Sequence, residues 1–314
     1  MIGRELAPRV LRRIAHALDP ALLIREKIAR LERDVTDAFA IALGKTAIAM
    51  ACGVGPVQRG VCLATRDDPA VLPAGWQRVV LAPPWNEDKT RYARELLVDL
   101  VAAVGATDQL LFVIANGAEG LLGPELADGK LVRMALAPAY TLVLSDDTTS
   151  HLATVSDGPT VPYRTGDRIE NVLPQREAAI PVRDELDELG LQAVELARVT
   201  GDVDEIADRI GAALRDAEPL AIMRVFWGLY HLHGQHHRLA LQLARYLEGG
   251  PWAAIVLGTD GAPGAYVAPG TMEAIRAAGL DPDRDDPTKI FEAINGIAVT
   301  PSTGMDHGDL VLVG

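Results

Sequence analysis

The sequence has few of the features that mark secreted or membrane-embedded proteins. It contains only two cysteines, Cys52 and Cys62, too few for a disulfide framework, so we interpret both as small core residues. No apolar run is long enough to cross a membrane, and the amphipathic residues 1–18 lack the uniform apolar region of a signal peptide. These absences predict a cytoplasmic protein without a membrane partner.

Positive charge is scarce as well. The 30 lysines and arginines are outnumbered by 43 aspartates and glutamates, which gives a net charge of −13. Because no basic cluster relieves this balance, the sequence argues against a nucleic-acid partner. No internal repeat or low-complexity linker interrupts the 314 residues, and 49% of them are hydrophobic. Such a chain can form one large domain or two ordinary domains with a sizeable core.

Short apolar runs alternate with helical patterns along most of the chain. Asp19-Pro20 separates two helical patterns near the N-terminus, with Asp19 as the expected N-cap. The alternation predicts an α/β fold with two domains, each a mainly parallel sheet flanked by helices, facing each other across a cleft. We place the boundary near Ala217, which gives domains 1–217 and 218–314. The expected strands include 38–43, 61–64, 109–115, 140–144, 192–196, 220–226 and 253–257.

Polar residues follow the predicted strands, where an α/β sheet binds its ligands. Gly44-Lys45-Thr46 stands between a strand and a helix, so a tight turn, free helix N–H groups and the Lys45 cation suit a phosphate or a carboxylate. The motif is not a P-loop because the distal glycine is absent. Asn116-Gly117 has the equivalent place after the next buried strand. Without a ligand, both segments would be simple turns, the first with a solvated lysine.

Acidic residues and histidines supply further candidates. Asp146 ends a strand, where it could hold Mg²⁺ or cap the next segment, and Asp260 follows the strand 253–257 directly. Four of the seven histidines fall within His231–His237. Such a cluster could bind a transition metal or supply a general base, although no cysteine accompanies it. A polar lining without metal is the interpretation that we favour.

Short motifs in both predicted domains occur in the order that one enzyme family shows. They are Gly44–Ala47, Ser145–Asp147, Asp157–Thr160, Gly258–Gly261 and Thr303–Leu310. The chain resembles the glycerate 2-kinases, which have Gly-Lys-Ala-Ala, Ser-Asp-Val and Ser-Gly-Pro-Thr at the first three places. Their C-terminal MOFRL domain has Gly-Thr-Asp-Gly and Thr-Gly-Thr-Asn-x-Asn-Asp-Leu at the last two. The chain looks like a shortened and divergent member, with a glycerate kinase-type domain followed by a MOFRL-like domain.

The resemblance implies an ATP-dependent kinase that transfers a phosphoryl group, with Mg²⁺, to a hydroxyl of a small glycerate-like hydroxy acid. Lys45 would stabilise the transferred group, and Asp146 or Asp260 would hold the metal. His236 or His237 would take the place of an arginine of the family. The expected cofactor-binding residues are Gly44, Thr46, Asn116, Gly117, Thr259, Gly261, Thr303 and Gly304.

The sequence also departs from the family. Ala115–Glu119 replaces a triple-glycine turn, the segment with an Arg-Lys-His-Leu-Ser motif is absent, and Gln235 replaces the functional arginine. Phosphoryl transfer needs positioned positive charge, and these departures remove part of it. Two alternatives to a kinase therefore stay open. One is a different enzyme, with an unknown cofactor, whose cluster His231–His237 does acid–base chemistry on a carboxylate substrate. The other is a non-catalytic relative that binds a small molecule or a partner chain. A homodimer is also left open.

Overall fold

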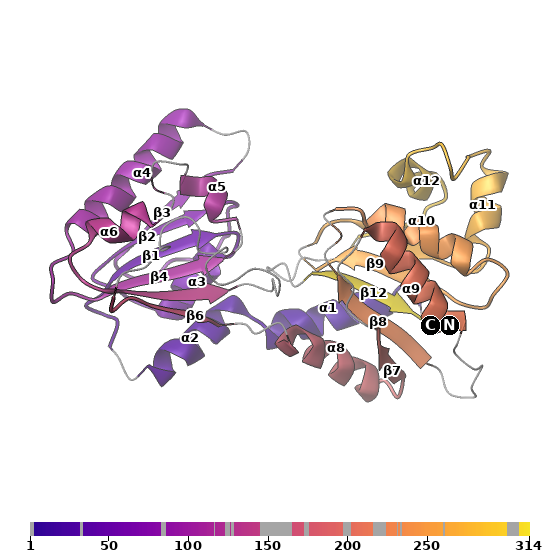
Figure 1. The fold of residues 1–314 in the computed structure, drawn as a ribbon, viewed down its shortest axis with the longest axis horizontal. Coiled ribbons are helices and arrows are strands. Elements are labelled where there is room, and N and C mark those ends of the chain that lie inside the picture. Colours follow the sequence, from indigo (N-terminus) through magenta and orange to yellow (C-terminus); the bar gives the residue numbers. More distant parts are fainter. Residues whose placement is uncertain are drawn as a thin grey trace. The chain divides into compact units, whose positions relative to one another are not determined.

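The structure is a computed structural model of the 314-residue chain. It describes residues 3–31, 34–82, 86–115, 117–122, 126, 129–144, 165–172, 176–196, 202–215, 224–230, 232, 234–259, 261–299 and 308–314. Two compact units make up the chain, and Figure 1 labels their elements. The parallel-sheet unit is Leu18–Gln175, and the mixed-sheet unit combines Met1–Ala17 with Arg176–Gly314. No helix in the described ranges is long and apolar enough to span a bilayer.

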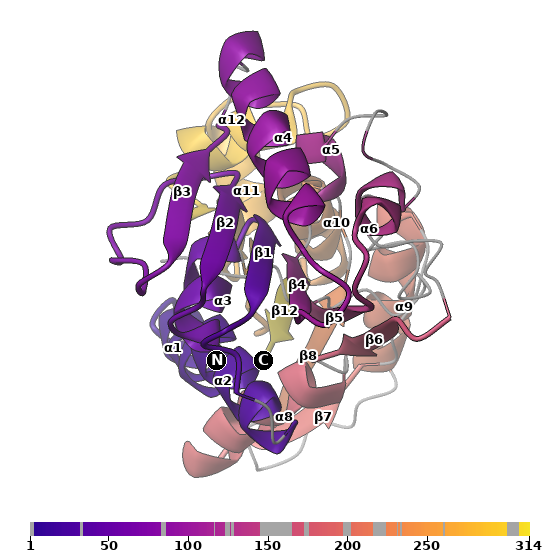
Figure 2. The same ribbon diagram turned by 90° about the vertical axis from the view of Figure 1, so that its left-hand side faces the viewer.

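The parallel-sheet unit has six strands in the order β3-β2-β1-β4-β5-β6, and every neighbouring pair is parallel. Figure 2 shows β3, β2, β1 and β4 side by side. β1 and β4 are buried along their whole length, which explains why their sequences are continuous apolar runs. The strands are β1 (Phe39–Gly44), β2 (Arg59–Ala64), β3 (Trp76–Val80), β4 (Leu110–Ala115), β5 (Ala139–Leu144) and β6 (Arg168–Asn171).

Helices cover this sheet. They are α2 (Pro20–Arg30), α3 (Ala47–Val54), α4 (Glu87–Ala102), α5 (Glu119–Leu122) and α6 (Lys130–Met134). Residues of α4, α5 and α6 form one core with Phe39, Ile41 and Leu43, whereas α3 contacts β1, β2 and β4 and packs against α2. Asp19 caps α2, because its Oδ1 accepts hydrogen bonds from Ala21 N at 2.7 Å and Leu22 N at 3.1 Å. The predicted helix break at Asp19-Pro20 is therefore confirmed.

The mixed-sheet unit also has six strands, in the order β11-β10-β9-β12-β8-β7. Only β7 and β8 pair in parallel, and the other four pairs are antiparallel. The prediction of a mainly parallel sheet is thus correct for the first unit and wrong for this one. β9 and β10 are separated by too few residues for a crossover helix, so they pair antiparallel. The strands are β7 (Gln192–Glu195), β8 (Arg224–Tyr230), β9 (Ala254–Gly258), β10 (Gly264–Val267), β11 (Ile297–Ala298) and β12 (Asp309–Val313).

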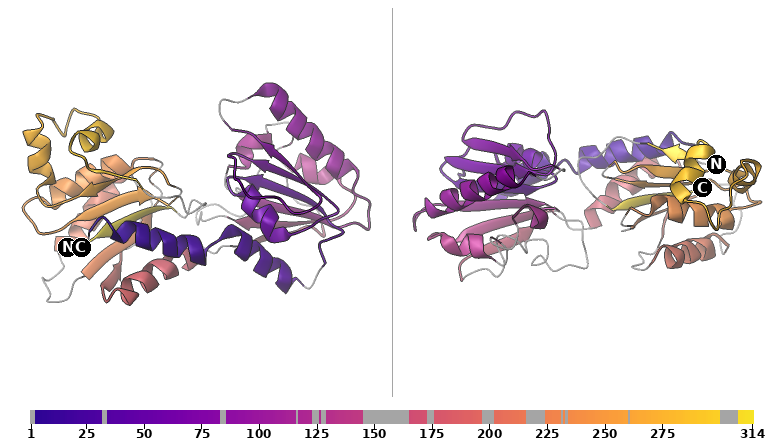
Figure 3. Two further views of the ribbon diagram at one scale, coloured as in Figure 1. Left: turned by 180° about the vertical axis from the view of Figure 1, so that it is seen from behind. Right: turned by 90° about the horizontal axis from the view of Figure 1, so that it is seen from above.

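The boundaries between the two units differ from the single boundary that the sequence predicts near residue 217. β7 pairs with β8, so the residues from Arg176 onward belong with the C-terminal strands. α1 joins the same unit, where Arg9 Nε lies 3.0 Å from Glu185 Oε1 on α8. Figure 3 shows α1 in indigo alongside this unit. Local patterns do not reveal a contact between residues so far apart in sequence. The helices are α1 (Leu6–Ala17), α8 (Arg176–Glu188), α9 (Val203–Arg215), α10 (His236–Tyr246), α11 (Thr271–Ala277) and α12 (Pro287–Ala293).

Candidate functional site

The strand order of the parallel sheet defines where a ligand is expected. From β1 the chain moves through β2 and β3 to one edge of the sheet and then returns to β4 on the other side of β1. This reversal is a topological switch point, and open α/β sheets bind ligands outside the carboxyl ends of the strands there. Gly44-Lys45-Thr46, which we call the switch-point turn, lies at this place. Gly44 has φ 113°, a conformation that favours glycine, and α3 begins immediately after Thr46.

Gly117 lies against the switch-point turn. A Cβ atom at Gly117 would be 3.4 Å from Lys45 Cγ and 3.7 Å from Thr65 Cγ2, and its φ is 86°. The loop after β4 therefore approaches the residues that follow both β1 and β2. The structure thus brings the predicted residues Gly44, Lys45 and Gly117 together at one edge, and it adds Thr65.

Thr46 is the most informative polar group of the switch-point turn. Its side chain stands at the N-cap position of α3 but makes no capping hydrogen bond. The residue is 6% exposed, and its Oγ1 is buried without a hydrogen-bond partner in the part of the chain that the structure describes. An unsatisfied buried hydroxyl costs roughly 1–3 kcal/mol. An anion bound here could accept hydrogen bonds from this hydroxyl and from the N–H groups of the first turn of α3. The switch-point turn is therefore a candidate anion-binding site.

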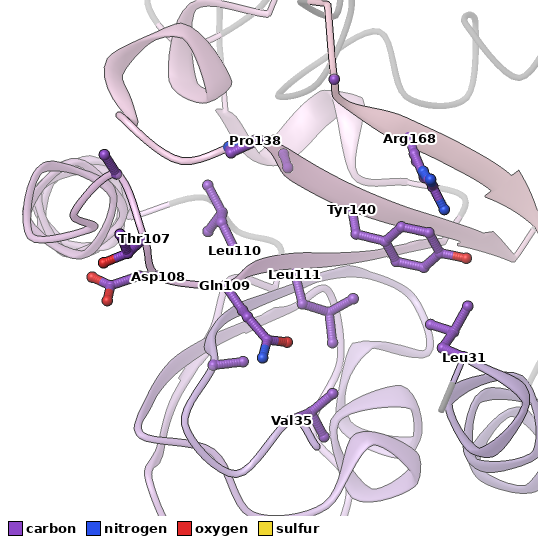
Figure 4. A pocket seen from close by; sticks show the side chains of 14 residues that line it. Leu31, Val35, Thr107, Asp108, Gln109, Leu110, Leu111, Pro138, Tyr140 and Arg168 are labelled. Atoms are coloured by element: carbon purple, nitrogen blue, oxygen red, sulfur yellow. The ribbon is translucent and has the colours of Figure 1, made fainter. Parts of the chain in front are cut away.

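A pocket of ≈340 Å³ lies at the opposite edge of the same sheet (Figure 4). Its lining includes Ala38, Leu110, Ala139 and Arg168, which stand at the amino ends of β1, β4, β5 and β6. Because ligands of such sheets bind at the carboxyl ends, we do not assign this pocket to the candidate site.

The mixed-sheet unit holds the remaining described candidates. Thr259 directly follows β9 and is fully buried. Its backbone N and its Oγ1 both donate hydrogen bonds to Gly308 O, at 3.2 and 2.7 Å. Gly308 has φ 91°, and a Cβ there would lie 2.9 Å from Tyr230 O. These contacts tie together the residues that flank β9, β12 and β8.

His236 is the first residue of α10 and makes a buried contact with Asp309. Its Nε2 lies 2.5 Å from Asp309 Oδ1, while Asp309 Oδ2 accepts a hydrogen bond from Leu232 N at 2.5 Å. His236 is 3% exposed and Asp309 is 9% exposed. In the sequence, Asp309 looks like a residue that only caps a turn. Its partner His236 is distant along the chain, so local sequence does not reveal the contact. The carboxylate joins the segment before α10 to the start of β12.

Both ring nitrogens of His237 are engaged within the unit. A carbonyl oxygen can only accept, so Nε2 carries the proton that it donates to Gly264 O at 3.1 Å. Nδ1 then accepts from Thr288 Oγ1, also at 3.1 Å. Burial lowers the pKa of His237 below its ordinary value, which favours the neutral ring. These contacts describe a side chain that holds α10 against β10 and α12.

Several predicted residues lie outside the described residues, so their roles stay predictions. They are Asn116, Asp146, His231, His233, Asp260, Thr303 and Gly304. Gly261 is described, and its φ of 92° explains the glycine at that turn. Within the described ranges, no group of three or more His, Cys, Asp or Glu side chains could hold a metal ion. The Mg²⁺ prediction therefore depends on Asp146 and Asp260.

Comparison with known proteins supports the fold. No protein-family model matches the sequence, and no curated protein matches it either. The structure is similar to the crystal structure of a glycerate kinase from Thermotoga maritima, with a TM-score of 0.80 over 99% of this chain and 98% of that chain. The chain has a glycerate kinase-like fold. At 17% sequence identity, the similarity shows the fold alone.

A second solved structure has the same glycerate kinase-like fold. The PH0495 protein from Pyrococcus horikoshii OT3 matches with a TM-score of 0.72 and 15% identity, over 100% of this chain and 99% of that chain. Both alignments extend across the two units. The fold is therefore shared over nearly the whole chain, at 15 to 17% sequence identity.

Proposed function

We propose that the protein is a divergent glycerate kinase-like phosphotransferase. It would transfer the γ-phosphoryl group of ATP, with Mg²⁺, to a hydroxyl of a small glycerate-like hydroxy acid. The observation that carries this proposal is the position of the switch-point turn, where Lys45, Thr46 and Gly117 converge at the carboxyl ends of β1 and β4. As the sequence predicts, such an enzyme would act in the cytoplasm.

The residues of the switch-point turn suit a phosphate chemically. Phosphoryl transfer is catalysed largely by positioning and by electrostatic stabilisation of the transferred group. The Lys45 ammonium supplies a positive charge beside the N-terminus of α3, whose backbone N–H groups favour an anion. Gly117 brings the loop after β4 against Lys45 and Thr65, where an added Cβ would be 3.4 and 3.7 Å from their side chains. ATP would therefore suit these residues, and Asp146 or Asp260 would hold Mg²⁺.

The histidine contacts bear on the alternative enzyme class. A general base needs a ring nitrogen that can reach the substrate proton. His237 uses both of its nitrogens within the unit, and His236 Nε2 is engaged with the buried Asp309. We therefore give both histidines positioning roles, and we place the phosphate-binding charge on Lys45.

An assay of ADP formation tests the proposal. The purified chain is mixed with ATP, MgCl₂ and D-glycerate, and ADP release is followed with a coupled enzyme. We expect glycerate-dependent turnover, and we expect Lys45→Met to lower kcat/KM by about a hundredfold to a thousandfold. Lys89→Met, at an exposed position on α4, is the matched control and should leave turnover unchanged.

Calorimetry separates the remaining outcomes. Binding of ATP with Mg²⁺ in the absence of turnover would support a non-catalytic relative. No ATP binding at millimolar concentration would overturn the proposal.

A further inference from the structure

Arg66 follows the strand that neighbours the switch-point turn. In the parallel pairing of β1 and β2, Gly44 is opposite Ala64. Lys45 and Thr65 therefore leave the sheet side by side, on strands about 4.8 Å apart. Gly117 lies beside both residues, because a Cβ added there would be 3.4 Å from Lys45 Cγ and 3.7 Å from Thr65 Cγ2, so these chain ends stay together. Arg66 is the next residue, so a second cation emerges at the same edge as Lys45.

The loop that follows Arg66 is held in place by Arg78 on β3. Arg78 Nη1 donates to Asp68 O at 2.7 Å and to Asp67 Oδ1 at 3.3 Å, and Nη2 donates to Ala70 O. Asp67, the carboxylate next to Arg66 in sequence, is thereby paired with another arginine. The backbone of Arg66 is thus fixed between a buried strand and an anchored loop.

We propose that Arg66 is a second phosphate-binding residue, acting with Lys45 and the N-terminus of α3 on a polyphosphate. The planar guanidinium can donate two parallel hydrogen bonds to one phosphate group, whereas the Lys45 ammonium acts as a point charge. Two cations beside a helix N-terminus match a ligand with several negative charges better than they match a ligand with a single carboxylate. The buried hydroxyl of Thr46, which has no hydrogen-bond partner among the described residues, is independent evidence that this edge of the sheet binds an anion. That the polyphosphate belongs to a nucleotide rests on the proposed function, but the anion site itself does not.

Calorimetric titration with tripolyphosphate tests the site without a nucleotide. We expect Arg66→Gln to weaken the affinity about tenfold to a hundredfold, the range for a lost hydrogen bond to a charged group. Arg66→Lys should recover part of this loss, and its affinity should still fall as salt rises. Arg59→Gln is the matched control, because Arg59 is an exposed arginine at the other end of the same strand. It makes the same change in net charge and should bind like the wild type.

The outcomes separate this inference from the kinase proposal. If Arg66→Gln loses tripolyphosphate affinity while the wild type shows no phosphoryl transfer, the anion site stands and the kinase proposal fails. If the wild type phosphorylates glycerate and Arg66→Gln matches it in both tripolyphosphate affinity and KM for ATP, the role of Arg66 is refuted. A wild type that does not bind tripolyphosphate would also refute it. Thermal denaturation of each variant shows whether the fold is kept.

Discussion

His236 Nε2 and Asp309 Oδ1 lie 2.5 Å apart in the core of the mixed-sheet unit, although the residues are 73 positions apart in sequence. Asp309 also accepts the backbone N–H of Leu232. One carboxylate therefore satisfies two donors that would otherwise be buried without an acceptor. This arrangement ties the start of α10 to the start of β12.

Replacing Asp309 by an apolar residue should destabilise the unit. Asp309→Leu removes both acceptors, so we expect the free energy of unfolding to fall by about 3 kcal/mol in urea denaturation. The matched control is Asp283→Leu, which removes an ion pair with Arg245 at an exposed carboxylate and should cost less than about 1 kcal/mol. Equal effects of the two substitutions would contradict the buried role of Asp309. The double variant His236→Leu/Asp309→Leu should be less unstable than the sum of its parts.

His237 should make stability depend on pH. Its pKa is lowered in the folded protein, chiefly by burial, so the unfolded chain binds a proton more readily. The stability that the neutral ring contributes is fully present above the unfolded pKa of about 6.5 and is lost as the pH falls through the folded value. Urea denaturation at pH 7.5 and pH 5.5 should show this loss. In His237→Gln, which does not titrate, the difference between the two pH values should be smaller, and an unchanged difference would exclude His237 as its source.

Thr46→Val should separate stability from binding. The substitution removes a buried hydroxyl without a described partner, so the free protein should be as stable as the wild type or up to about 1 kcal/mol more stable. Affinity for tripolyphosphate should fall, because the hydroxyl can no longer donate. The control is Thr271→Val, since Thr271 Oγ1 accepts a hydrogen bond from Ala268 N at 2.8 Å and its loss should destabilise. A Thr46→Val protein that is destabilised like Thr271→Val would show that the hydroxyl serves the fold.

Gly117→Ala should weaken ligand binding, and the loss of affinity should be larger than the loss of folding stability alone would cause. Its φ of 86° strains any residue with a Cβ by roughly 1–2 kcal/mol, and the added methyl would stand 3.4 Å from Lys45 Cγ. Gly249→Ala is the matched control, because φ there is 77° and nothing lies within 4 Å of the added Cβ. Both variants should lose similar stability in thermal denaturation. Only Gly117→Ala should lose affinity for ATP and tripolyphosphate, and equal affinities would argue against a ligand at this loop.

Local sequence predicted strands β1, β2, β4 and β5 of the parallel-sheet unit, but not the edge strand β6. The apolar runs that became β1 and β4 are buried on both faces, so no alternation was needed to recognise them. Asp19-Pro20 marks a helix start through contacts within three residues. The switch-point turn was found because glycine, a cation and a helix start stand together in the sequence. Its convergence with Gly117 depends on the pairing of β1 with β4, which are not consecutive strands, and the sequence alone did not predict that pairing.

The sequence by itself determined the α/β class, the helix break at Asp19-Pro20 and the turn at Gly44, because these features depend on neighbouring residues. Only the tertiary structure decided that the second sheet is mostly antiparallel, that residues 1–17 pack with 176–314, and that Arg66 emerges beside Lys45. It also decided the partner of His236. The physical reason is that strand pairing and buried charge contacts join residues tens to hundreds of positions apart, and a local pattern carries no record of the partner.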